Sequence, residues 1–453
     1  MGNYTLSHPH LLLLVLLFSC PEVQKRCARA SETVNHEEHD SYVVEMKSLT
    51  PATTCKDQAK GRGLTLAHRQ GPCSPIAANR QSRDSSIIFL RDQACFRSMN
   101  IQGPSHWPTA GNPGEDVRLP LHPGEGEFLE GEFLVTIGLG TPKVDLTLIF
   151  DTGSDITWTQ CEPCPSCYLP SKSTTYSCPS CSPTNCTYSI TYADGSNSSG
   201  YKVRDLLTLT PENKFPNFIF GCAEKTSNFH AADGILGLGQ GDVTLISQTA
   251  SNLSQIFCYC IPRSESSNGY LLFGSEALST CQTDSYTPII KDLKNPSFYF
   301  VKLVGMAFGK RKFDFSAQSQ QSPPARTIID SGTTITRLPP LIYSAVRAEF
   351  GKYMSKYPVA PKQSKLLNKC YDLRGQKNVS LPKIVLRFEK TNLGLDPFAV
   401  VWRKKNKQVC LAFAPNKNLS DPVIIGNVQQ RNLNILYNIP DEKVEFGNGG
   451  CGN

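Results

Sequence analysis

Two aspartate tripeptides stand out in the sequence because they share one pattern although they lie far apart. Asp151-Thr152-Gly153 and Asp330-Ser331-Gly332 each follow an apolar pair, and a hydroxyl residue comes next in both, Ser154 and Thr333. One such tripeptide alone would be an ordinary turn. Two of them in the same apolar context indicate a pair of carboxyl groups with a shared role.

The chemistry open to such a pair follows from electrostatics. Two buried carboxyl groups about 3 Å apart cannot both ionise cheaply, so they share one proton and titrate as a unit. The ionised group can act as general base on a water between them, and the protonated group can polarise a peptide carbonyl. We therefore predict that Asp151 and Asp330 are catalytic, with no metal and no cofactor. The residues predicted to support them are Thr152, Ser154, Ser331 and Thr333.

The segments after the two tripeptides point to an internal duplication. An apolar-apolar-Gly motif follows each: Gly237 lies 86 residues after Asp151, and Gly426 lies 96 residues after Asp330. Glycine permits a tight bend and close backbone approach at such positions. The repeat predicts two similar halves facing each other across a pseudo-two-fold axis.

Apolar residues alternate with polar or small ones along much of the chain, which is typical of half-buried strands. Helical patterns are few, and the best of them is a stripe at 340–354 with proline at its start. The fold class is therefore mainly β. The strands are predicted at 133–139, 144–150, 201–209, 215–220, 298–304, 383–388 and 433–439.

Composition excludes several other chemistries. The chain has 453 residues, 19% of them charged and 39% hydrophobic, which is enough to bury a core in two domains. Of its eight histidines, only His230 lies after His122, which argues against Ser-His-Asp, Cys-His and His-ligated zinc sites there. The net charge of +7 is too small to indicate nucleic-acid binding by itself. The short basic run at 403–407 is interpreted as a solvated loop.

Several of these motifs resemble pepsin-type aspartic proteases, and within them the plant nepenthesin-like group. The similar segments are FDTGSDITWTQC at 150–161, DSGTT at 330–334 and IIGNVQQ at 424–430, within a resemblance from about Gly131 to Cys451. HRQGPCS at 68–74 resembles a subgroup with chloroplast-nucleoid-type members. The resemblance implies a bilobal pepsin-like fold with an active-site cleft between the lobes. It also implies aspartic endopeptidase activity with an acidic pH optimum.

Family roles extend to a few matching positions. Tyr192 matches the tyrosine of a flap that closes over substrate, and Trp158 matches the tryptophan that hydrogen-bonds its hydroxyl. Gly153 and Gly332 would place backbone groups along the substrate. Ala193 stands where the family usually has a flap glycine, and its methyl group is expected to lower activity if that position needs the freedom of glycine.

The cysteines favour a disulfide framework. Six crowd between Cys161 and Cys186, where zinc or an iron cluster is the alternative. From residue 121 onward there are 13 cysteines, an odd number, and Cys258 stands where the group usually has serine, so it is the predicted unpaired thiol. The disulfide candidates are Cys161, Cys164, Cys167, Cys178, Cys181, Cys186, Cys222, Cys260, Cys281, Cys370, Cys410 and Cys451.

The apolar run at 11–18 fits the core of a signal peptide better than a membrane span. We predict a signal peptide at 1–30, a propeptide at 31–120, an N-terminal catalytic lobe at 121–268 and a C-terminal catalytic lobe at 269–453. A small extra domain is the alternative for 31–120. Secretion is the predicted location, with the chloroplast or vacuole as alternatives. In a secreted chain the sequons at Asn197, Asn252, Asn378 and Asn418 are glycosylation candidates.

The expected partners are a protein or peptide substrate and pepstatin-type inhibitors. The protein is expected to be a monomer, with no membrane partner and no nucleic-acid partner. Two alternatives remain open from the sequence. One is a catalytically weak or inactive pepsin-fold binding or inhibitor protein. The other is a chloroplast nucleoid-associated protease that binds DNA.

Overall fold

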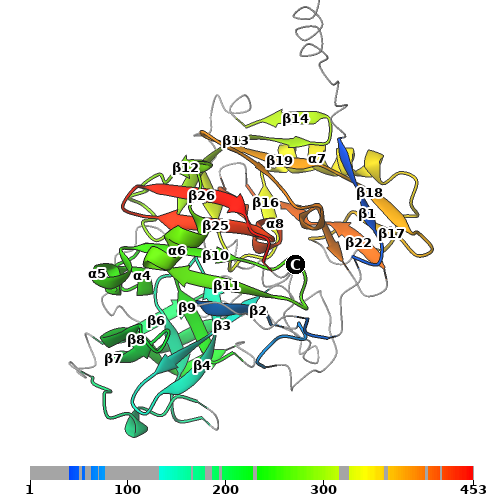
Figure 1. Ribbon diagram of the computed structural model, residues 1–453. Helices are drawn as coiled ribbons and strands as arrows, with labels where there is room; N and C mark the ends of the chain where they lie inside the picture. The colour runs from blue at the N-terminus through cyan, green and yellow to red at the C-terminus, as the bar shows by residue number, and fades with distance from the viewer. Residues whose placement is uncertain are drawn as a thin grey trace, which may run out of the picture. The chain divides into compact units, whose positions relative to one another are not determined.

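The computed structural model of the chain describes residues 40–49, 54–56, 63–69, 71–76, 132–164, 167–178, 186–192, 196–227, 232–315, 326–361, 366–403, 407–418 and 421–451. The chain divides into a unit Met1–Asp40 and a unit Ser41–Asn453, and every element below belongs to the second (Figure 1). The predicted signal peptide at 1–30, most of the predicted propeptide, Cys181 and Ala193 lie outside the described residues.

Strands dominate the described part of the chain, as the alternation predicts. One 13-stranded sheet contains, in spatial order, β12 (Tyr286–Pro288), β26 (Lys443–Asn448), β25 (Leu433–Asn438), β10 (Ile256–Cys260), β11 (Asn268–Phe273), β2 (Leu64–His68), β3 (Phe133–Leu139), β4 (Val144–Asp151), β9 (Gly234–Gly237), β5 (Trp158–Gln160), β8 (Lys214–Ser227), β7 (Asn197–Thr208) and β6 (Thr187–Thr191). The predicted strands at 133–139, 144–150, 201–209, 215–220 and 433–439 all lie in this sheet and are confirmed.

A second sheet of eight strands carries the other half of the repeat. Its path is β20 (Asn392–Gly394), β19 (Ile384–Phe388), β13 (Phe300–Phe308), β15 (Arg326–Ile329), β24 (Val423–Ile425), β16 (Thr336–Leu338) and β23 (Phe413–Pro415), with β14 (Arg311–Asp314) paired to β13. Two smaller sheets are β17 (Cys370–Asp372), β22 (Gln408–Leu411) and β21 (Val401–Arg403), and β1 (Ser41–Glu45) with β18 (Asn378–Pro382).

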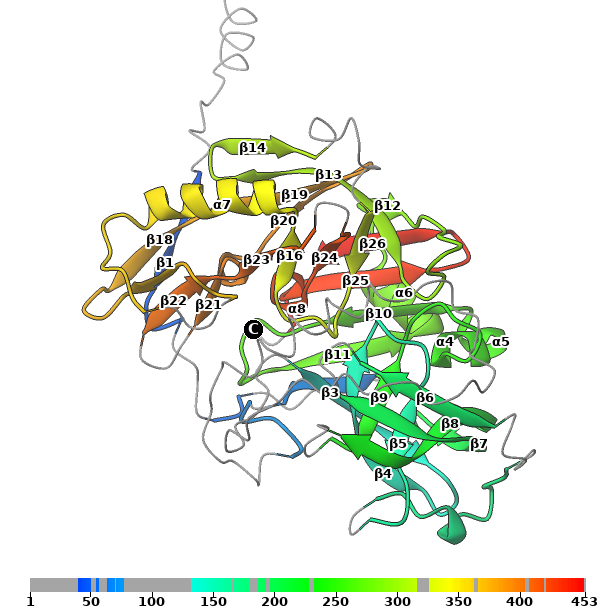
Figure 2. The same ribbon diagram turned by 180° about the vertical axis from the view of Figure 1, so that it is seen from behind.

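Helices are few and mostly short. The predicted helix is α7 (Pro340–Tyr353), which begins with proline, buries Ile342, Val346 and Phe350 and lies beside β18 (Figure 2). In the part of the chain that the structure describes, no helix is both long and apolar enough to cross a membrane. The shorter helices are η2 (Pro170–Lys172), α4 (Leu245–Gln248), α5 (Ala250–Leu253), α6 (Gly274–Cys281), η4 (Pro397–Ala399) and α8 (Asn427–Gln430).

The internal duplication predicted from the two tripeptides is present in the strand topology. In the first half, β4 pairs parallel with β9, β9 antiparallel with β5, and β5 parallel with β8. In the second half, β15 pairs parallel with β24, β24 antiparallel with β16, and β16 parallel with β23. The same connection therefore delivers an aspartate from the end of β4 and another from the end of β15.

Part of the predicted propeptide lies inside the large sheet. Strand β2 pairs with β11 on one side and with β3 on the other, where Ala67 is opposite Leu134. Arg69, which directly follows β2, is almost completely buried and forms an ion pair with Glu132. Residues 63–69 therefore belong to the core sheet of this chain rather than to an appended domain.

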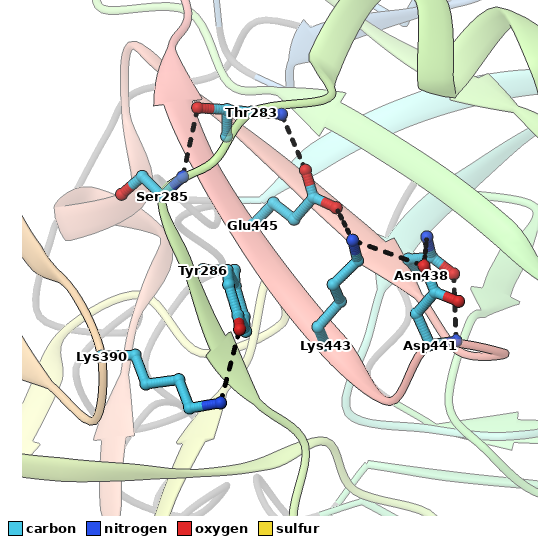
Figure 3. Close-up of polar contacts among 8 residues, drawn as sticks. All are labelled: Thr283, Ser285, Tyr286, Lys390, Asn438, Asp441, Lys443 and Glu445. Atoms are coloured by element: carbon cyan, nitrogen blue, oxygen red, sulfur yellow. Dashed lines mark hydrogen bonds and ion pairs between the residues drawn. The ribbon is translucent and has the colours of Figure 1, made fainter.

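A buried charge ties the C-terminal hairpin β25–β26 to the segment before β12 (Figure 3). The Glu445 carboxylate is fully buried, accepts the backbone N–H of Thr283 at 2.7 Å and pairs with the Lys443 ammonium at 3.0 Å. Lys443 also lies 3.3 Å from Asp441, which bonds to Asn438 across the hairpin turn. Because a buried carboxylate is stable only when it is paired, these contacts favour one register of the hairpin.

Candidate active site

The structure brings the two predicted catalytic aspartates together. Asp151 is the last residue of β4, and Asp330 comes directly after β15. Both are buried, with exposed fractions of 9% for Asp151 and 1% for Asp330. Both carboxyl groups face the space beside Gly153, where a Cβ atom would lie 2.7 Å from Oδ1 of Asp330 and 3.2 Å from Oδ1 of Asp151. This is the arrangement in which two carboxyl groups can share one proton.

The glycines of the two tripeptides make this approach possible. A Cβ atom on Gly153 would lie 2.7 Å from Oδ1 of Asp330, and one on Gly332 would collide with Oδ1 of Asp151. Each glycine therefore leaves room for the aspartate of the other half. Any larger residue at either position would push the two carboxyl groups apart.

Thr152 and Ser331 brace the two turns against each other. The backbone N–H of Thr152 donates to Oγ of Ser331 at 3.0 Å, and the N–H of Ser331 donates to Oγ1 of Thr152 at 3.0 Å. Both hydroxyls also donate to backbone carbonyls of the opposite half, those of Ile329 and Phe150. All of these groups are buried, so the hydrogen bonds lie in a medium of low dielectric constant and hold the halves in register.

Each carboxyl group receives a matching set of donors from its own turn. Oδ1 of Asp151 accepts the Gly153 N–H at 2.9 Å, and Oδ2 accepts the Ser154 hydroxyl at 2.6 Å. Oδ1 of Asp330 likewise accepts the Gly332 N–H at 2.8 Å, and Oδ2 accepts the Thr333 hydroxyl at 2.6 Å. Donors of this kind stabilise the ionised carboxylate.

Burial opposes ionisation of the pair. It raises the pKa of Asp330 to about 7, helped by the negative charge of Asp151. Burial also raises the pKa of Asp151, but hydrogen bonds from Ser154, Gly153 and Asp330 act in the opposite direction. The carboxyl groups therefore retain a proton at pH values where free aspartates have lost theirs.

Trp158 and Tyr192 contact each other in the first half. Nε1 of Trp158 donates to the Tyr192 hydroxyl, and the ring centroids are 6.4 Å apart. Trp158 is fully buried at the start of β5, and Tyr192 follows the end of β6. The two residues thus form the pair that the sequence predicts.

Two polar residues near the site were missed by sequence reasoning. Asp155 accepts hydrogen bonds from the Ser297 hydroxyl at 2.5 Å and from the Gly241 N–H at 3.0 Å. It therefore links the loop before β13 to the first half. Nδ2 of Asn427 donates to the backbone carbonyl of Ser331 at 3.0 Å. Both lie inside the motifs 150–161 and 424–430, but nothing in those motifs indicates which atom they contact.

Disulfides occupy most of the described cysteines. Cys258, predicted as the unpaired thiol, is bonded to Cys281, so that prediction was wrong; Cys186, a disulfide candidate, is a buried thiol. Nothing in the sequence indicated which of these two cysteines would be in a disulfide. Cys178 is also in a disulfide. The bonds with both partners described are Cys55–Cys73, Cys161–Cys222, Cys164–Cys167, Cys258–Cys281, Cys260–Cys451 and Cys370–Cys410.

These bonds bear on the metal alternative for the cysteine-rich segment. Cys161, Cys164 and Cys167 lack the thiolates that zinc or an iron cluster would need, because each is in a disulfide. Among the residues described, no group of three or more His, Cys, Asp or Glu side chains is placed to hold a metal ion. A disulfide-stapled loop remains the better interpretation of this segment.

Comparisons with known proteins agree with this geometry. The family model Xylanase inhibitor N-terminal matches residues 133–275, and Xylanase inhibitor C-terminal matches 298–448. The basic 7S globulin from soybean has a similar structure, with a TM-score of 0.59 and 18% identity over 71% of this chain and 95% of that chain. Conglutin gamma from lupine seeds gives a TM-score of 0.57 and 20% identity over 71% of this chain and 92% of that chain. These structures establish the fold: two β lobes of the pepsin-like class.

The sequence relatives are more specific. An aspartyl protease family protein of Arabidopsis thaliana is 36% identical over 97% of this chain and 98% of its own length. Aspartic proteinase nepenthesin-2 of Nepenthes gracilis is 30% identical over 74% of this chain and 80% of its own. The chain belongs to this plant family of pepsin-like, aspartic-type endopeptidases.

Proposed function

We propose that the protein cleaves peptide bonds at acidic pH with a water molecule held between Asp151 and Asp330. The observation that carries the proposal is the pair of buried carboxyl groups that converge on the two turn glycines, each lying against the glycine of the other half. No other cluster among the described residues combines burial, raised pKa values and matched donors in this way.

The environments of the two groups assign their roles. Asp151 is more exposed and is the ionised member, so it removes a proton from the water as the water oxygen bonds to the peptide carbonyl carbon. Asp330 carries the proton and passes it toward the carbonyl oxygen, which gives a gem-diol. When the C–N bond of the gem-diol breaks, the proton on Asp151 moves to the leaving amine, and one gem-diol hydroxyl returns its proton to Asp330. The substrate is therefore a peptide or an unfolded protein segment.

This assignment gives the pH dependence its sign. Activity requires Asp151 to be ionised, so it falls at low pH. It also requires Asp330 to be protonated, and the pKa of that group is raised to about 7, so activity falls as the pH rises toward and through neutrality. The Trp158–Tyr192 pair supports a flap that covers bound substrate.

The test is cleavage of an unfolded protein substrate by the acidified full-length protein, with and without pepstatin. Asp151→Asn and Asp330→Asn should each lower pepstatin-sensitive cleavage by at least about a thousandfold, because the dyad then lacks its base or its acid. Asp145→Asn is the matched control, since this exposed carboxylate lies on the same strand β4 and pairs only with Lys143.

Two outcomes would contradict the proposal. Cleavage that persists in both dyad variants would exclude this mechanism. A folded wild-type protein without pepstatin-sensitive cleavage would favour the alternative of a binding or inhibitor protein on the same fold.

We also propose that the chain is secreted as a zymogen with a signal peptide at 1–30, a propeptide at 31–120 and lobes at 121–268 and 269–453. The disulfides support an oxidising compartment. The burial of β2 in the core sheet supports a prosegment that folds with the lobes it precedes. All four predicted glycan acceptors, Asn197, Asn252, Asn378 and Asn418, have exposed side chains, as glycosylation requires.

A further inference from the structure

A layer of buried tyrosines lies directly beneath the two aspartate turns. Tyr259 on β10, Tyr437 on β25 and Tyr299, the residue before β13, are fully buried. The ring centroids of Tyr299 and Tyr437 are 4.4 Å apart, and Tyr259 lies edge-on to Phe150, the residue before Asp151, at 4.9 Å. Buried phenols need hydrogen-bond partners, so where these hydroxyl groups bond shows what the layer supports.

The Tyr259 hydroxyl bonds to a glutamine that reaches the second aspartate turn. It lies 2.7 Å from Oε1 of Gln430, the last residue of α8. Nε2 of Gln430 donates to the backbone carbonyl of Asp330 at 3.0 Å and to that of Ile425 at 2.7 Å. Tyr259, Gln430 and Asp330 all have exposed fractions of 1% or less.

The direction of this chain of hydrogen bonds is fixed by chemistry. Two backbone carbonyls can only accept, so the amide NH₂ of Gln430 must face them and its oxygen must face Tyr259. The Tyr259 hydroxyl must then donate. The sequence from Tyr259 through Gln430 to the carbonyl of Asp330 is thus a single ordered relay in a region of low dielectric constant.

The peptide unit at the end of this relay is the one that links the two halves. Its carbonyl belongs to Asp330 and accepts from Gln430, while its N–H belongs to Ser331 and donates to Oγ1 of Thr152 at 3.0 Å. One peptide plane is therefore held at both ends, by Thr152 of the first half on one side and by Gln430 of α8 on the other. Rotation of that plane would swing the Asp330 carboxyl group away from Asp151.

We propose that Tyr259 and Gln430 are positioning residues for peptide hydrolysis, which set the orientation of the Asp330–Ser331 peptide and thereby the spacing of the two carboxyl groups. The proposal rests on the function proposed above. Neither side chain contacts a carboxyl oxygen of the dyad or is exposed to substrate. Their loss should therefore reduce kcat and leave KM unchanged.

The first test replaces the glutamine. Gln430→Leu should lower kcat about tenfold with KM within twofold of wild type. The matched control is Gln429→Leu, because Gln429 is an equally buried amide of α8 whose Nε2 donates to Ala399 and Ala412 instead. Gln430→Glu, which keeps one donor and one acceptor when protonated, should recover part of the lost kcat.

The second test replaces the phenol. Tyr259→Phe should lower kcat about threefold or more, because Gln430 loses the donor that orients it. Tyr270→Phe is the control: its hydroxyl lies on the neighbouring strand β11 and bonds to Asn434 at 2.6 Å. Equal losses of kcat in Gln430→Leu and Gln429→Leu, or in the two tyrosine variants, would show a role in stability alone and overturn the proposal.

A measurement independent of turnover separates this proposal from the function on which it rests. The ¹³C carboxyl signal of Asp330 can be titrated in the full-length protein. Gln430→Leu should shift its midpoint at least half a pH unit downward relative to Gln429→Leu, since a looser turn admits water and separates the charges. An unchanged midpoint would refute the positioning role. A shifted midpoint in Gln430→Leu, together with a wild-type protein that cleaves nothing, would refute the peptidase function and retain the positioning role.

Discussion

The two halves of the site share one topology but support their aspartates by different means. In the first half, the carbonyl of Asp151 accepts a backbone N–H, that of Leu238, at 2.9 Å. In the second half, the corresponding carbonyl of Asp330 accepts the side-chain amide of Gln430. The carbonyl of Asp330 is therefore held by a side chain from α8, while the carbonyl of Asp151 is held by main chain.

The two carboxyl groups also differ in burial, which bears on the proposed placement of the proton on Asp330. Asp330 and Thr333 are each only 1% exposed, whereas Ser154 beside Asp151 is half-buried. The cost of charging a carboxyl group rises with its burial, so the enclosed half favours the neutral acid and the open half favours the carboxylate. A duplicated fold thus yields two unlike carboxyl groups without any change in the D-[ST]-G pattern itself.

The largest effect is expected from closing the space that the halves leave for each other. Gly332→Ala places a methyl group against Oδ1 of Asp151, and Gly153→Ala places one 2.7 Å from Oδ1 of Asp330. Either change should lower kcat/KM at least about a hundredfold, because the carboxyl groups can no longer share a proton. Steady-state kinetics with an unfolded protein substrate measures this.

A glycine elsewhere supplies the control for that comparison. A Cβ on Gly394 would meet nothing within 4 Å, so Gly394→Ala should retain wild-type activity. Full activity in Gly332→Ala would mean that the carboxyl groups do not need to be this close.

A second prediction concerns stability and pH. The pKa of Asp330 in the folded protein is raised to about 7 from an ordinary value of 3.8. Its contribution to stability is therefore fully present below pH 3.8 and is lost as the pH rises through about 7. Asp330→Asn removes this titration, so the variant should be more stable than wild type at pH 8, by roughly 2 kcal/mol, with the difference shrinking toward pH 5.

Urea unfolding of the full-length protein at pH 5, 6, 7 and 8 measures that difference. This range avoids strong acid, in which the wild-type protein would cleave itself. If Asp330→Asn and wild type differ by the same amount at every pH, burial does not raise the pKa of Asp330, and the two halves do not differ in the way described above.

Sequence reasoning could locate the site but not the support behind it. The D-[ST]-G repeat and the apolar-Gly motifs predicted the duplication, because a carboxyl group at the end of a buried strand leaves a local pattern. The roles of Tyr259 and Gln430 left no such pattern, since they depend on strands β10 and β25 and helix α8 meeting in space. The Cys258 prediction failed for the same reason: its partner, Cys281, is set by how α6 packs on β10.

The smallest effect is the most specific to the difference between the halves. The Ser154 hydroxyl stabilises the ionised form of Asp151, so Ser154→Ala should raise the pKa of Asp151 and move the acidic limb of the kcat/KM profile to higher pH. Thr333→Val removes the equivalent donor from Asp330, raises its pKa and moves the alkaline limb to higher pH. One variant narrows the profile and the other widens it, each by about half a pH unit. Thr333→Ser and Ser154→Thr keep the hydroxyl and should restore the wild-type limbs. If both variants moved the same limb, the proton would not be assigned to one half of the molecule, and the two turns would be equivalent despite their different surroundings.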